Sequence, residues 1–96
     1  MKNFTEYKES LSLSSPPSSL NVYLQALWYD AKDNWSKAHS LVDSLEDKTA
    51  CWVHAYLHRK EGDASNAAYW YSRAKTPPCQ SSFEEEWEEI ASSLLR

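Results

Sequence analysis

A single glycine, Gly62, occurs in this chain of 96 residues, and that scarcity restricts the possible folds more than any other feature. Sheets built from tight β-hairpins need glycine-containing turns at short intervals, so hairpin-built sandwiches and barrels are excluded. The five tryptophans and six tyrosines supply the large apolar surfaces that a disordered chain lacks. The sequence therefore predicts one small, folded, all-α domain.

The N-terminal segment differs in composition from the rest of the chain. Residues 1–17 are rich in serine and end in two prolines, which predicts an arm outside the core. Within this arm, Phe4, Tyr7 and Leu11 are spaced along one helix face, so a short docked helix and a mobile terminus both remain open. Residues 18–96 are expected to form a single helical-repeat domain.

Apolar periodicity and capping residues predict five helices after this arm. Their approximate ranges are 18–32, 35–46, 48–61, 64–75 and 82–95. Asp47 and Asp63 are expected N-caps, and Ser82 with Glu85 forms a capping-box pattern. Gly62 follows the third helix at the position where a left-handed residue commonly closes a helix.

An internal similarity relates the first pair of these helices to the second pair. Aligning residues 33–38 with 62–67 places Ala26 over Ala55 and Ala38 over Ala67, at an offset of 29 residues. The small, turn, aromatic and proline positions of the second unit match the tetratricopeptide-repeat family. These positions are Ala55, Gly62, Asp63, Ala67, Tyr71, Ala74, Pro77 and Pro78.

The run 67–74 is similar to the Sel1-like relatives of the tetratricopeptide-repeat family. This resemblance implies two antiparallel helical hairpins, which the last helix would cap, and a non-catalytic scaffold that binds a protein or peptide. Residues 52–63 also resemble a group of short bacterial helical proteins, and that second resemblance implies no activity.

Charge and hydropathy narrow the classes of partner. The net charge of -4 argues against general nucleic-acid binding, although residues 48–80 are basic between acidic flanks. No stretch approaches the roughly 20 apolar residues that span a bilayer, and the first residues lack the apolar core of a secretion signal. We therefore expect a cytoplasmic protein with no membrane contact. Antiparallel helices would bring Cys51 and Cys79 together, so a disulfide between them is geometrically conceivable, but the expected reducing compartment favours two free thiols.

The basic middle of the chain supplies the predicted binding face. The repeat register implied by the resemblance places aromatic and basic residues on the groove-lining side of the hairpins. The predicted partner-binding residues are Trp52, Tyr56, Arg59, Lys60 and Arg73. An aromatic surface beside cationic groups suits an acidic peptide or a terminal carboxylate. The alternatives are charge balance with the glutamate-rich last helix, a small anionic ligand, and self-association into a homo-oligomer.

The histidines provide the competing hypothesis. His54 and His58 are one helical turn apart, and with Glu61 or Asp63 they form a candidate zinc or iron site for a small metal-dependent or anion-binding enzyme. The general base of a His-Glu-x-x-His protease is missing, because Ala55 takes its place. We favour a structural role in which a ring nitrogen meets a buried carbonyl or hydroxyl. On that interpretation the protein is not an enzyme and has neither cofactor nor metal.

Two further expectations concern single residues of the histidine hypothesis. The Tyr71 hydroxyl is one group to which a buried histidine could hydrogen-bond. His39 stands alone in its predicted helix and is expected to be solvated.

Overall fold

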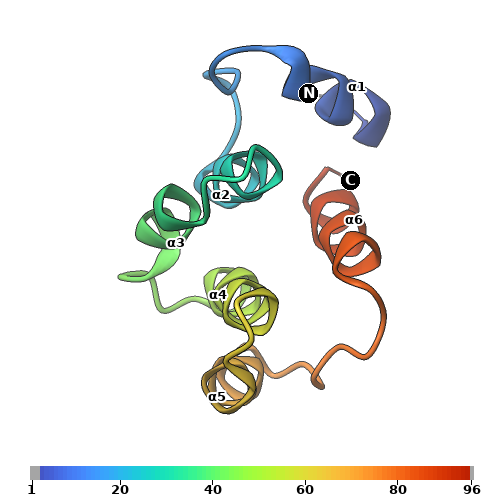
Figure 1. Cartoon of the computed structure of the whole chain (residues 1–96). Helices are drawn as coiled ribbons and strands as arrows, with labels where there is room; N and C mark the ends of the chain where they lie inside the picture. Colours follow the sequence, from blue (N-terminus) through green and yellow to red (C-terminus); the bar gives the residue numbers. More distant parts are fainter. Residues whose placement is uncertain (1–2, 96) are drawn as a thin grey trace.

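The computed structural model describes residues 3–95, and within this range it contains helices and no strands. The α-helices are α1 (Phe4–Glu9), α2 (Val22–Ala31), α3 (Trp35–Val42), α4 (Lys48–Lys60), α5 (Ala64–Ala74) and α6 (Phe83–Leu94), with a 3-10 turn, η1 (Ser10–Ser12), after α1. The prediction of an all-α fold is confirmed. Figure 1 shows α2 to α5 following one another in a stack, with α6 alongside and α1 above α2 and α6.

Two predicted helix boundaries are wrong by about one turn. Helix α2 begins at Val22 instead of residue 18, because Asn21 is the N-cap and its side chain accepts from the Leu24 N–H at 2.8 Å. Helix α3 ends at Val42 instead of residue 46. Aspartate and serine follow Val42, and such residues compete with the helix for backbone hydrogen bonds.

The predicted caps are confirmed. The side chains of Asp47 and Asp63 accept from backbone N–H groups at the starts of α4 and α5. Ser82 and Glu85 form a reciprocal capping box at the start of α6. Gly62 has a φ of 91°, as expected for the left-handed residue that closes a helix.

The turns of the two hairpins have the same geometry. Asp33, which occupies the position of Gly62 in the first unit, also has a positive φ, of 62°. The next N–H bonds back in the same way in both turns, from Asn34 to Tyr29 O and from Asp63 to His58 O, each at 2.9 Å. The two turns are therefore structurally equivalent, and they are separated by the 29 residues that the internal similarity of the sequence indicated.

The N-terminal segment packs on the core as a short helix. Tyr7 of α1 is fully buried, its hydroxyl donates to Leu24 O at 2.6 Å, and its ring stacks on Trp87 at 5.6 Å between centroids. Of the two alternatives weighed for this segment, the structure has the docked helix.

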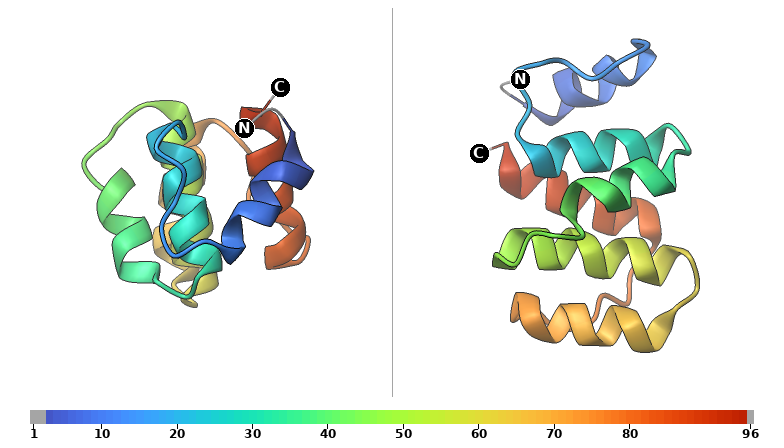
Figure 2. Two further views of the ribbon diagram at one scale, coloured as in Figure 1. Left: turned by 90° about the horizontal axis from the view of Figure 1, so that it is seen from above. Right: turned by 90° about the vertical axis from the view of Figure 1, so that its left-hand side faces the viewer.

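Helix α4 is the centre of the molecule. It runs antiparallel to α5 in Figure 2, and α2, α3 and α6 also contact it. Ala55 of α4 and Ala67 of α5 are buried where these two helices meet, beside Tyr71. Small side chains at such positions allow close helix packing.

The two cysteines are free thiols, of which Cys51 is buried and Cys79 is partly exposed. Among residues 3–95, no helix is long and apolar enough to cross a membrane.

Replacing Gly62 with alanine should lower the free energy of unfolding by about 1 kcal/mol. A Cβ at this position meets no atom within 4 Å, so the cost comes from the positive φ alone. Urea denaturation of the variant and the parent measures the difference. The matched control is Asp33→Ala, where a non-glycine residue already holds the left-handed conformation, and it should cost less. Superimposable curves for Gly62→Ala and the parent would contradict the prediction.

Replacing Ala67 with leucine should destabilise the protein by about 1–3 kcal/mol, because the larger side chain overpacks the contact with α4. Ala68→Leu is the control, since Ala68 is the next residue of α5 and is exposed. Chemical denaturation should separate the two variants. Equal stability of both would show that α4 and α5 are not closely packed at Ala67.

Candidate functional site

Two of the predicted partner-binding residues are engaged by a buried carboxylate of α6. Glu86 has no exposed surface. The Trp52 indole N–H donates to its Oε2 at 3.2 Å, and Arg59 Nη1 donates to its Oε1 at 2.9 Å. The Tyr71 hydroxyl also donates to it, at 2.6 Å from Oε2. Glu86 therefore joins α4, α5 and α6 through one side chain.

A second buried carboxylate engages two more of these residues. Asp30 of α2 accepts from the Tyr56 hydroxyl at 2.7 Å and from Lys60 Nζ at 3.0 Å. Burial, with the charge and hydrogen bond of Asp30, raises the pKa of Tyr56 well above its usual range. Tyr56 is therefore a protonated core residue.

Arg73 is exposed and is not held by either of these buried carboxylates. Its guanidinium lies over the Trp70 ring at 5.3 Å and reaches Glu46 at 3.4 Å. The other four predicted residues hydrogen-bond to Glu86 or Asp30. This arrangement corresponds to the alternative in which the basic residues are balanced by acidic residues of the same domain. A partner that took over the polar groups of Trp52 and Arg59 would have to break their hydrogen bonds to Glu86.

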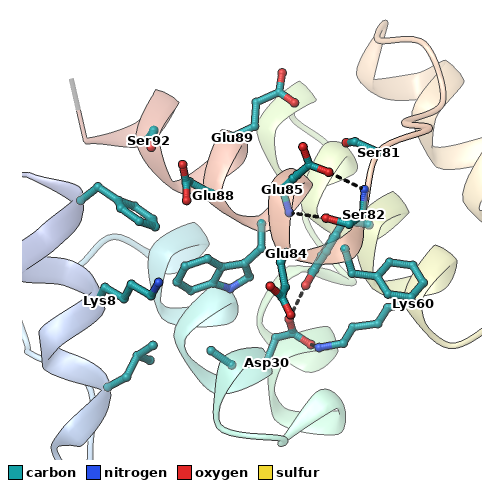
Figure 3. Close-up of a pocket in the computed structure, with 16 residues that line it drawn as sticks. Lys8, Asp30, Lys60, Ser81, Ser82, Glu84, Glu85, Glu88, Glu89 and Ser92 are labelled. Carbon is teal, nitrogen blue, oxygen red and sulfur yellow. Dashed lines mark hydrogen bonds and ion pairs between the residues drawn. The ribbon is translucent and has the colours of Figure 1, made fainter.

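A cleft of about 990 Å³ opens where α1, α2, α4 and α6 meet. We call it the α6 cleft. Its lining residues are Phe4, Lys8, Leu11, Asp30, Ala31, Tyr56, Lys60, Ser81, Ser82, Phe83, Glu84, Glu85, Trp87, Glu88, Glu89 and Ser92. Figure 3 shows α1 on one side of the cleft and α6 above it, with Asp30 and Lys60 below.

The α6 cleft combines apolar side chains with a negative charge. Phe4 and Leu11 are partly exposed, and Phe83 is 42% exposed. Asp30 and Lys60 pair with each other, which leaves Lys8 as the remaining lysine. Four exposed glutamates line the α6 side, namely Glu84, Glu85, Glu88 and Glu89. The cleft is therefore acidic with an apolar component.

The histidines form a second candidate site. His54 and His58 are 4% and 7% exposed, and His39 of α3 lies against them. We call these three residues the histidine cluster. His39 Nε2 is 2.9 Å from His54 Nε2, so the prediction that His39 is solvated is wrong. Helix α3 of the first hairpin packs against α4 of the second, and this contact brings the three rings together.

Aromatic packing and burial determine the electrostatics of the histidine cluster. The His54 ring stacks on Trp70 at 4.0 Å, and the His39 ring stacks on Trp35 at 4.8 Å. Burial, followed by the neighbouring His39 and His58 rings, lowers the pKa of His54 to about 4. Burial also lowers the pKa of His39. These two rings are therefore neutral at pH 7.

The two carboxylates proposed with the histidines have different positions. Glu61 Oε1 is 2.7 Å from His58 Nδ1. The side chain of Asp63 caps α5. One of its carboxylate oxygens also lies within 4.8 Å of a ring nitrogen of His58 and a carboxylate oxygen of Glu61. Tyr71 hydrogen-bonds Glu86, so the example of a Tyr71 hydroxyl meeting a histidine is wrong.

Two residues of these sites were not identified from the sequence. Glu86 belongs to a run of glutamates. Its burial could have been inferred from its spacing of four residues from Ile90, which places it on the buried face of α6. His39 is distant in sequence from the other histidines, and only the contact between α3 and α4 places it near them.

Comparison of the chain with protein-family models, with curated proteins and with solved structures finds no match.

Replacing Glu86 with alanine should lower the free energy of unfolding by about 3–5 kcal/mol, because it leaves the partly buried charge of Arg59 without its partner. Glu89→Ala is the control, because Glu89 lies on the exposed side of the same helix, and it should change stability by no more than about 0.5 kcal/mol. Denaturant melts followed by tryptophan fluorescence give both values. A loss below about 1 kcal/mol in Glu86→Ala would show that this carboxylate does not hold α6 in place.

Proposed function

We propose that the protein is a non-catalytic helical scaffold and that the α6 cleft binds a basic peptide segment of a partner protein. The observation that carries this proposal is the charge of the cleft. Four exposed glutamates line it, against Lys8 and the paired Lys60. Complementary charge attracts and orients a partner of the opposite sign.

The apolar part of the cleft supports a peptide over a small cation. Phe83, Phe4 and Leu11 present partly exposed apolar surface beside the glutamates. Aliphatic or aromatic side chains of a peptide would bury this surface while its lysines or arginines meet the carboxylates. The occupant is therefore a basic segment that also carries apolar residues.

The sign of this partner differs from the acidic peptide expected from the sequence. That expectation rested on Arg59 and Lys60 being available, and both have carboxylate partners within the chain. Binding an acidic segment there would require breaking these ion pairs, one of which is to a buried glutamate. The α6 cleft is available without such a cost.

The test uses two synthetic peptides with the same leucine positions, one with lysines and one with glutamates at the remaining positions. Fluorescence anisotropy at low and moderate salt should detect binding of the lysine peptide, with an affinity that falls as salt rises. Reversing two charges in Glu84→Lys/Glu88→Lys should weaken binding by about tenfold.

The matched control is Glu9→Lys, which reverses an exposed charge of α1 that does not line the cleft. It should change the affinity by less than about threefold. Equal binding of both peptides, or equal loss in both variants, would overturn the proposal. Preference for the glutamate peptide would instead favour the acidic partner expected from the sequence.

A further inference from the structure

The histidine cluster places three imidazoles from two helices at one point. His39 comes from α3, and His54 and His58 come from successive turns of α4. One ring nitrogen of each lies within 4.8 Å of the other two, and the ring centroids are 4.7–5.2 Å apart. Imidazole nitrogens are preferred ligands of divalent transition metals.

A carboxylate is hydrogen-bonded to one of the three rings. Glu61 Oε1 lies 2.7 Å from His58 Nδ1, whereas Asp43 Oδ2 lies 3.8 Å from His39 Nδ1, which is too far for a hydrogen bond. A carboxylate that accepts the Nδ1–H of a histidine fixes the tautomer in which Nε2 carries the lone pair. It also raises the basicity of that ring as a metal ligand. Both features are typical of histidines that bind metal.

The third ring, His54, has one nitrogen without a partner in the described part of the chain and one in contact with His39, and the ion would bind at the second of these. Among residues 3–95, His54 Nδ1 is the one buried side-chain nitrogen or oxygen without a hydrogen-bond partner. The other nitrogen, Nε2, lies 2.9 Å from His39 Nε2, where one of the two rings has to donate a proton. A cation between the two Nε2 atoms would replace that proton.

We propose that His39, His54 and His58 bind one divalent transition-metal ion of the zinc class, with Glu61 as the carboxylate that orients His58. Tetrahedral zinc with Zn–N bonds of about 2.0–2.1 Å holds its nitrogens about 3.4 Å apart, so the His39–His54 pair opens slightly. The His58 nitrogen, which lies within 4.8 Å of the other two, approaches them by at most about 1.4 Å. Three protein ligands leave a fourth position for water. The His39 side chain is 25% exposed and gives the ion a route of entry.

This ligand set differs from the one suggested by the sequence, in which Glu61 or Asp63 would complete the site. In the structure Glu61 occupies Nδ1 of His58, and the Asp63 side chain accepts from Asn66 N at the start of α5. His39 takes the ligand position instead.

The test begins with protein treated with EDTA and then titrated with Zn²⁺ by calorimetry, or with Co²⁺ followed by its visible d–d bands. The parent protein should bind one equivalent and melt at a higher temperature with the metal. His39→Phe keeps an aromatic ring against Trp35 but removes the ligand atoms, so it should abolish the one-equivalent binding and the cobalt spectrum. Glu61→Gln should weaken binding by about 10–100-fold.

Asp63→Asn is the matched control, because asparagine caps a helix as well as aspartate does. It should bind Zn²⁺ like the parent. Circular dichroism and a urea melt without metal verify that His39→Phe is folded. The proposal is overturned if the parent binds no stoichiometric metal, if folded His39→Phe binds it equally well, or if Asp63→Asn loses it.

Discussion

The buried carboxylate of Glu86 is the interaction on which the arrangement of the helices depends. A charge without exposed surface is costly unless every acceptor position is used, and here an indole, a guanidinium and a phenol all donate to it. These donors come from α4 and α5, whereas Glu86 belongs to α6. The last helix is therefore held in one position and orientation against the second hairpin.

The position of α6 determines where the α6 cleft forms. The residue after Glu86 is Trp87, whose indole N–H donates to Leu27 O at 2.9 Å and whose ring contacts Phe4 and Tyr7. Successive residues of α6 thus anchor it to the second hairpin and to α1. The exposed glutamates are on the remaining faces of the same helix, where they line the cleft. Its acidity is a consequence of how α6 is turned.

The histidine cluster depends on a different part of the fold. Its rings come from α3 and α4, which belong to different hairpins. Trp35 links them further, because its ring stacks on His39 while its indole N–H donates to Leu57 O at 2.8 Å. The contact between hairpins that buries apolar surface also brings three titratable rings together and leaves one of their nitrogens without a partner.

The sequence alone determined the five helices after residue 17 and most of their ends, because caps and apolar periodicity act within a few residues of the chain. Gly62, Asp63 and the Ser82–Glu85 box were therefore predictable. The missed start of α2 shows the limit of this approach, since Asn21 competes with several nearby serines as a cap. Only the tertiary structure decided which charges are buried and which side chains meet. Glu86 is the same residue type as the exposed glutamates next to it in the chain, and His39 is 15 residues from His54. The physical reason is that their environments come from helix packing, which joins residues far apart in the chain.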